Sequence, residues 1–286
     1  MNHDYPTPAP IRVVLDLLVG ATVTVTAAQT TTSTLSITPS DPTKKDDLRA
    51  LEEVVVDFAD GVLAARIPRT LRYYTWFSGS PHLTVEITVP AGSSIEGKIG
   101  AGNISTVGPL DGCDVRTGAG ELRVEQAAKT TLHTGAGAVQ AGRIGGPLQI
   151  TSGSGSIRVG TLEGAGFIKN STGRTTLGEV EGPLTVKSST GDVTIEQLNG
   201  SADIKCAHGE VRIDRVGTGE VKIEGGYGSI EVGVPEGTAA WLDIASRHGT
   251  LRNELQQASA PVESDRTVAI TAHADYASIT IRRPEV

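Results

Sequence analysis

The sequence predicts an all-β protein, a parallel β-helix (β-solenoid) built from coils of about 18 residues. Composition is the first observation: 35 glycines, one methionine and 3% aromatic residues among 286 suit short strands joined by tight turns. The second observation is a short sequence motif that recurs along the chain, as in STGDVTI and AHGEVRI. A repeat that alternates apolar residues but cannot bury its own apolar face is typical of a solenoid.

Nine glycines mark the repeat, each 17 to 21 residues after the one before: Gly102, Gly120, Gly137, Gly155, Gly173, Gly191, Gly209, Gly228 and Gly249. Glycine suits these turns because it adopts positive φ without steric cost. The glycine pattern has a clear exception near the end of the chain, where Ala277 stands in the place of a turn glycine.

Three apolar columns accompany the turns and are predicted to point inward, since side chains alternate across a strand. Two residues after each of the first eight glycines stand Ile104, Leu122, Val139, Ile157, Thr175, Val193, Val211 and Ile230. Four residues after it stand Thr106, Val124, Ala141, Val159, Leu177, Ile195, Ile213 and Val232. Five before the next glycine stand Val115, Leu132, Ile150, Ile168, Val186, Ile204 and Ile223. The columns lack the six-residue rhythm of left-handed hexapeptide helices, so the crossover rule favours a single-stranded, right-handed coil.

The flanks differ from the repeats and are expected to cap them. Residues 1–90 form a strand-rich region continuous with the solenoid, residues 91–252 the repeats, and residues 253–286 a helix or loop insertion followed by final strands. Bare solenoid ends would associate edge to edge, which is the reason for expecting caps.

Within the first flank, the elements follow from local pattern. Ile11–Val19 and Ala21–Ala27 alternate about Gly20 and indicate a strand pair. A short helix is expected at about 46–53, after Pro42, and a hairpin about Ala59-Asp60-Gly61. The loop that follows concentrates aromatic and histidine side chains: Tyr73, Tyr74, Trp76, Phe77 and His82.

Charge and hydropathy exclude several classes of function. A net charge of −8 argues against a nucleic-acid partner, which demands clustered Lys and Arg. The most apolar early run, IRVVLDLLVGATVTV, is interrupted by Arg12 and Asp16, and the opening MNHDYPTPAP has no basic region of a signal peptide. We therefore expect a cytoplasmic protein that does not bind membranes.

Two patterns raise the question of catalysis or metal binding. Asp192 and Glu210 each follow a turn glycine on neighbouring coils, a spacing that would suit a retaining glycosidase pair. A solvated ladder of charges is the favoured interpretation. His208 and His248 also precede turn glycines, but Tyr227 holds the place between them, which separates the imidazoles by roughly 10 Å, too far to share a zinc ion.

The remaining motifs favour structural roles. Cys113 and Cys206 are predicted to lie five coils apart, which excludes a disulfide and is consistent with a reducing compartment. The turns TGAGEL and TGAGAV lack the Lys-Ser/Thr of a phosphate loop. No catalytic residue, cofactor or metal site is predicted.

One column of charge is the best binding hypothesis. Lys169, Lys187 and Lys205 stand four residues before successive turn glycines and are expected to form a stripe on one face. Stacked like charges repel, so either the side chains extend separately into water or an anionic partner docks along them. Glu163 and Glu181 stack on the loop side and would oppose the stripe in charge.

The chain resembles the bacterial putative-adhesin domains of unknown function that are built from β-strand repeats, of the actinobacterial type. The resemblance rests on TGAGELRV, SGSGSIRV and STGDVTIEQLNG, with the early SDPTKKDD and the late EGTAAWLDIASRHGTLRN, and spans nearly the whole chain. It implies a β-solenoid with no active-site motif.

The expected function is therefore a non-enzymatic scaffold or interaction protein that binds an unknown protein or anionic partner. It is also expected to self-associate end to end as a homo-oligomer. The alternative is a glycan-binding surface adhesin or a carbohydrate-active β-helix enzyme.

Overall fold

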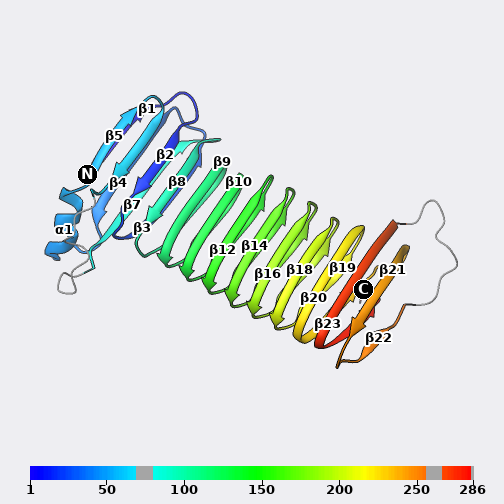
Figure 1. Ribbon diagram of the computed structural model, residues 1–286. Helices are drawn as coiled ribbons and strands as arrows, with labels where there is room; N and C mark the ends of the chain where they lie inside the picture. Colours follow the sequence, from blue (N-terminus) through cyan, green and yellow to red (C-terminus); the bar gives the residue numbers. More distant parts are fainter. Residues whose placement is uncertain (69–79, 256–265, 285–286) are drawn as a thin grey trace. The chain divides into compact units, whose positions relative to one another are not determined.

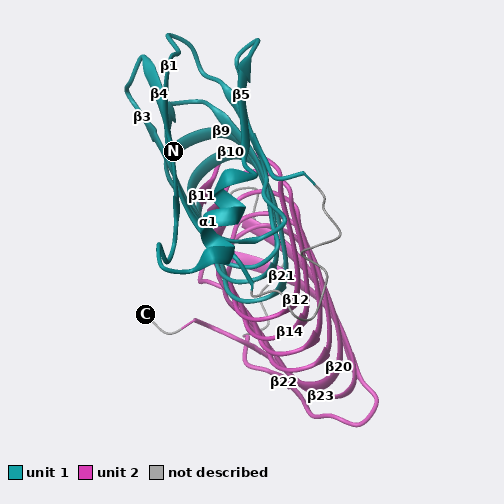
Figure 2. Cartoon of the chain, turned by 90° about the vertical axis from the view of Figure 1, so that its left-hand side faces the viewer, with its two compact units in different colours: residues 1–142 teal, residues 143–286 magenta. Residues whose placement is uncertain are grey.

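A computed structural model describes residues 1–68, 80–255 and 266–284, and within them the chain is almost entirely β-strand (Figure 1). The chain divides into two compact units, residues 1–142 and 143–286 (Figure 2). The division lies within β11 (Val139–Ile144). Most strand pairs are parallel and in register between successive coils, which confirms the predicted β-solenoid.

Unit 1 contains two parallel ladders that meet in one long strand, β9 (Ile104–Ala119). The first half of β9 pairs with β3 and its second half with β8, while β10 pairs along its length. The other strands of the ladders are β2 (Arg12–Asp16), β3 (Gly20–Ala28), β6 (Val62–Arg66), β7 (His82–Pro90), β8 (Ser94–Ile99) and β10 (Leu122–Ala136).

The order of coils in unit 1 departs from the order of the sequence. β2 pairs in parallel with β6 on one side and β8 on the other, and β3 likewise lies between β7 and β9. The chain start is therefore inserted between two later coils. The prediction that the strands about Gly20 pair with each other is wrong: Leu17 and Val19 are buried, and a positive φ at Leu18 turns a solenoid corner rather than a hairpin.

Antiparallel strands and a helix cover the outermost coil of unit 1. β5 (Val55–Ala59) pairs with β6 through the predicted hairpin, β4 (Thr32–Pro39) pairs with β7, and β1 (Asn2–Pro6) pairs with β4. The predicted helix is α1 (Lys45–Glu52), one residue earlier than expected. Its buried Asp47 carboxylate accepts backbone hydrogen bonds from Asp41 at 3.0 Å and His82 at 2.9 Å.

Unit 2 repeats one coil with little variation. Its first ladder runs from β12 to β14, β16, β18 and β20, and its second from β13 to β15, β17, β19 and β20. The strands are β12 (Leu148–Ser154), β13 (Ile157–Leu162), β14 (Gly166–Thr172), β15 (Thr175–Val180), β16 (Leu184–Thr190), β17 (Val193–Leu198), β18 (Ala202–His208), β19 (Val211–Val216) and β20 (Gly219–Gly233).

The last coils of unit 2 are also out of sequence order. β23 (Arg266–Arg282) pairs in parallel with β20, and on its other side with β21 (Thr238–Ser246) and β22 (Leu251–Asn253). Figure 1 shows β23 between β20 and β21. The coil of Gly249 was expected to stack directly on that of Gly228, which is wrong, because Ala277 occupies the intervening position.

The core is the predicted set of three columns, and all of its members are buried. Eight of the nine turn glycines have positive φ, and Gly249 is the exception. A side chain at Gly191 would place Cβ 2.4 Å from the carbonyl oxygen of Gly173, so the stacking of turns as well as φ demands glycine.

A fourth inward column is polar, and sequence reasoning missed it. It stands three residues before the turn glycines and contains Thr117, Thr134, Ser152, Asn170, Ser188 and Cys206. Thr134 Oγ1 donates to the carbonyl oxygen of Ala136 at 3.1 Å, and Asn170 Nδ2 donates to that of Gly173 at 3.0 Å. All of them except Ser152 donate to turn carbonyl oxygens, and Ser152 Oγ has no hydrogen-bond partner in the described part of the chain.

Some predictions stay open. The boundaries at residues 90 and 252 and the handedness of the coil stay predictions. The aromatic loop residues Tyr73, Tyr74, Trp76 and Phe77 lie outside the described residues, as does most of the predicted insertion that begins at residue 253.

Candidate functional site

The three predicted lysines form one column on unit 2. Lys169 on β14 is the register partner of Lys187 on β16, which in turn opposes Lys205 on β18, and all three side chains are exposed. Adjacent parallel strands lie about 4.8 Å apart, so the column presents regularly spaced ammonium groups.

The three lysines differ in what they contact. Lys205 Nζ lies 2.7 Å from Glu224 Oε2, and Lys222 Nζ lies 3.0 Å from Glu224 Oε1. The hydrogen bond to Glu224 raises the pKa of Lys205, and hydrogen bonds from both lysines lower the pKa of Glu224. Lys187 Nζ lies 5.7 Å from the centre of the Phe167 ring, a cation–π distance. Among the described residues, Lys169 forms no ion pair.

Because of these contacts, the net positive charge differs between the two ends of the lysine column. The carboxylate of Glu224 partly neutralises the charge of Lys205. The charge of Lys169, at the other end, is the least neutralised by neighbouring carboxylates. An anion that approaches the column would therefore meet the strongest positive charge near Lys169 and Lys187.

The predicted acidic counterpart is present on the loop side, where one carboxylate is paired with an arginine and the other accepts a hydrogen bond from a neutral amide. Glu163 Oε1 lies 3.0 Å from Arg143 Nη1, and Glu181 Oε1 accepts a hydrogen bond of 2.7 Å from Asn199 Nδ2. The side chains on this face therefore contact one another.

The carboxylate pair considered for glycoside hydrolysis has structural contacts. Asp192 Oδ2 lies 3.3 Å from Arg174 Nη2, and Asp192 Oδ1 accepts the backbone N–H of Glu210 at 3.1 Å. Asp192 thus links three successive coils, the role expected of a solvated ladder.

The two histidines before turn glycines belong to a stack of four rings. His208 stacks on Tyr227 with centroids 5.1 Å apart, Tyr227 on Tyr276 at 4.9 Å, and Tyr276 on His248 at 4.6 Å. Two tyrosine rings therefore separate the imidazoles, where the sequence suggested one. In the ranges 1–68, 80–255 and 266–284, no group of three or more His, Cys, Asp and Glu side chains is placed to hold a metal ion.

Both cysteines are free thiols in buried positions. Burial, helped by the nearby charge of Asp114, raises the pKa of Cys113 to about 12. Burial also raises the pKa of Cys206. Because the thiolate is the reactive form, neither position resembles that of a nucleophile.

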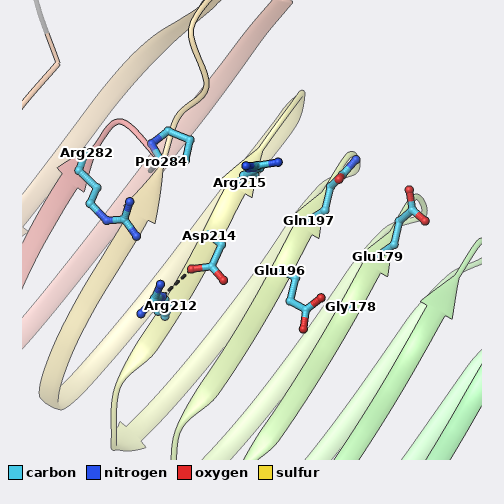
Figure 3. A pocket seen from close by; sticks show the side chains of 9 residues that line it. All are labelled: Gly178, Glu179, Glu196, Gln197, Arg212, Asp214, Arg215, Arg282 and Pro284. Carbon is cyan, nitrogen blue, oxygen red and sulfur yellow. Dashed lines mark hydrogen bonds and ion pairs between the residues drawn. The ribbon is translucent and has the colours of Figure 1, made fainter. Parts of the chain in front are cut away.

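A groove that the sequence did not predict crosses the second ladder of unit 2 (Figure 3). It has a volume of about 510 Å³, and its charged lining comes from β15, β17, β19 and β23: Glu179, Glu196, Arg212, Asp214, Arg215 and Arg282. Arg212 pairs with Asp214, and Arg282 with Glu231. No signal in the sequence indicated this groove, because Arg282 reaches it only through the inserted strand β23.

The groove is open and mixed in charge. Charges in an open site interact through water, where electrostatic attraction is weak, so it lacks the enclosed setting in which acid and base groups are tuned. Its chemistry suits weak contact with a surface that also carries both signs of charge.

No helix in the described part of the chain is long and apolar enough to cross a membrane. No protein with a curated description matches the sequence.

Comparison with protein families gives one match over nearly the whole chain. The model described as Toastrack DUF4097 matches residues 14–284.

Several solved structures resemble the chain at low identity. A putative adhesin from Parabacteroides distasonis is 11% identical, with 98% of this chain and 96% of that chain covered and a TM-score of 0.32. A putative adhesin from Bacteroides fragilis is 13% identical, with 99% and 96% covered and a TM-score of 0.32. A putative cell adhesion protein from Clostridium sporogenes is 11% identical, with 99% of both chains covered and a TM-score of 0.23.

Proposed function

This chain belongs to the Toastrack DUF4097 family, and we propose that it acts as a non-enzymatic β-solenoid scaffold that binds an acidic partner along the lysine column. The observation that carries the proposal is the register of Lys169, Lys187 and Lys205 on three adjacent parallel strands. Such a column keeps its spacing without any rearrangement of the fold. An extended acidic segment can therefore contact all three ammonium groups at once.

The positive charge at the Lys169 end of the column has no carboxylate partner among the described residues. This favours a role in binding an anionic partner over a surface without a binding role. Glu224 offsets Lys205, but the pair Lys169 and Lys187 keeps two like charges on adjacent strands. Directly opposed like charges destabilise a sheet, and an anion placed between them would relieve that repulsion. The preferred partner is an acidic protein segment, since the net charge of −8 disfavours nucleic acid.

Glycan binding is the alternative, and the aromatic stack does not favour it. Sugars stack on ring faces, but the faces of Tyr227 and Tyr276 are occupied by neighbouring rings. We also propose a cytoplasmic location, supported by two free buried cysteines in a protein that needs no disulfide. Cell fractionation tests this location.

The test of the lysine column compares two triple variants with equal charge changes. Lys169, Lys187 and Lys205 are replaced by Gln in one, and the exposed Lys44, Lys98 and Lys129 of unit 1 in the other. Binding of poly-L-glutamate is measured by biolayer interferometry. Because the first variant loses three exposed contacts to the polyanion, we predict a loss of roughly tenfold in its affinity.

The control variant should bind nearly as well as the parent, and added salt should weaken the parent. Equal losses in both variants would show an effect of net charge alone. Undiminished binding by the first variant would overturn the proposal.

A further inference from the structure

Within the described residues of unit 2, the last coil leaves its core open. β21 and β22 pair with β23 on one side, and no described strand pairs with their other side. Leu242 and Ile244 are half-buried in β21, whereas their register partners Ile270 and Ala272 on β23 are fully buried. The inward column therefore ends in apolar side chains that nothing in the described part of unit 2 covers.

The edge of β21 also lacks the usual protection of an exposed strand. Its sequence, TAAWLDIAS, contains one charged residue and no proline, and Trp241 is 64% exposed. Exposed edges are ordinarily interrupted by charge, proline or a bulge. At the outer coil of unit 1, by contrast, β5 and β4 pair with the outermost parallel strands β6 and β7.

We propose that β21 pairs in antiparallel fashion with β21 of a second copy of this chain, about a twofold axis at Leu242. A second copy fits because it offers an edge of equal length with the same open column, and a twofold contact is self-complementary. This inference extends the proposed scaffold role but uses a different surface. The lysine column and the edge can therefore fail independently.

The twofold pairing gives the side chains on both faces of the strand favourable neighbours in the second copy. Directly opposed residues of antiparallel strands lie on the same face of the sheet. On the inner face, Leu242 meets its own copy and Ala240 meets Ile244, so the two apolar interiors become continuous. On the outer face, Trp241 meets Asp243, and no like charges are opposed.

The experiment changes one exposed residue in two ways. Trp241→Asp would oppose the carboxylate of Asp243 in the second copy, and Trp241→Lys would oppose it with an ammonium group. Sedimentation equilibrium of the full chain is expected to show a concentration-dependent dimer. We expect Trp241→Asp to raise the dissociation constant at least tenfold relative to Trp241→Lys, with the gap shrinking at high salt.

A double variant provides the rescue. Asp243→Lys added to Trp241→Asp restores opposite charges across the axis and should recover dimerisation. Circular dichroism checks that each variant keeps its strand content, and Val107→Asp, an exposed change in unit 1, should leave dimerisation unaltered.

Three outcomes would overturn the proposal. They are a parent that stays monomeric up to hundreds of micromolar, equal effects of the Asp and Lys substitutions, and a double variant that remains as weak as Trp241→Asp.

Discussion

At the residue scale, the polar inward column explains why threonine, serine and asparagine recur before the turn glycines. An unpaired carbonyl group in the interior costs free energy comparable to a lost hydrogen bond. Thr117 Oγ1 donates to the carbonyl oxygen of Ala119 at 3.1 Å, and Asn170 Nδ2 also reaches that of Gly155 at 3.1 Å. A threonine, serine or asparagine three residues before a turn glycine can thus donate a hydrogen bond to a carbonyl oxygen of that turn.

Cys113 gives a residue-scale prediction about alkaline pH. Burial raises its pKa to about 12, so the folded state keeps the proton where the unfolded thiol ionises near pH 9. A raised pKa contributes stability that is intact below pH 9 and is lost as pH rises toward 12. Between neutral pH and pH 10, the free energy of unfolding of the parent should fall by about 1 kcal/mol more than that of Cys113→Ala. Urea unfolding measures this difference.

The control for this prediction is the pH dependence of the variant itself. Cys113→Ala lowers stability at neutral pH by a constant amount, since it removes a packed side chain. If the difference between parent and variant stays the same from pH 7.5 to 10.5, ionisation of Cys113 makes no contribution.

At the element scale, the regular coils were predictable and the inserted ones were not. The interior columns through Ile195, and the turn at Gly191, follow from periodicity because each coil contacts neighbours one period away. Strand β2 and strand β23 were misplaced because their partners are set by long-range pairing, which no local pattern records. The groove at Arg282 depends on that same insertion and could not be foreseen, whereas the lysine column, built from regular coils, could.

The insertion of β23 predicts an unusual response to truncation. A chain ending at residue 255 retains β21 and β22 but lacks the strand that pairs with them. A shorter chain ending at residue 234 stops after β20, whose own pairs with β18 and β19 remain. We expect the shorter chain to be the more soluble and thermally stable of the two, because it retains no strands without a partner.

Thermal melts and the soluble fraction after expression measure this difference. The reverse ranking, with the chain ending at 255 the more stable, would mean that β21 packs on β20 once β23 is gone.

At the scale of the whole molecule, composition and family agree on a β-solenoid fold. Its recurring turn glycines allow successive turns to stack closely, and its aliphatic columns form thin interiors within each unit. A solenoid of this kind makes stability additive between neighbouring coils. Its ends then determine whether the chain remains soluble, since each end is a potential sheet edge.

Deleting residues 1–90 tests whether the first flank is a cap. The deletion removes β2 and β3, the parallel partners of β8 and β9, together with the antiparallel strands β4 and β5 that cover the outer coil. The edges of β8 and β9 would be exposed, and we expect the shortened chain to form aggregates or filaments that light scattering detects. Deleting only residues 1–9 is the matched control. It removes β1, which pairs only with β4, and leaves the parallel ladders intact, so this variant should stay soluble. A soluble, folded monomer from the larger deletion would show that residues 1–90 do not act as a cap.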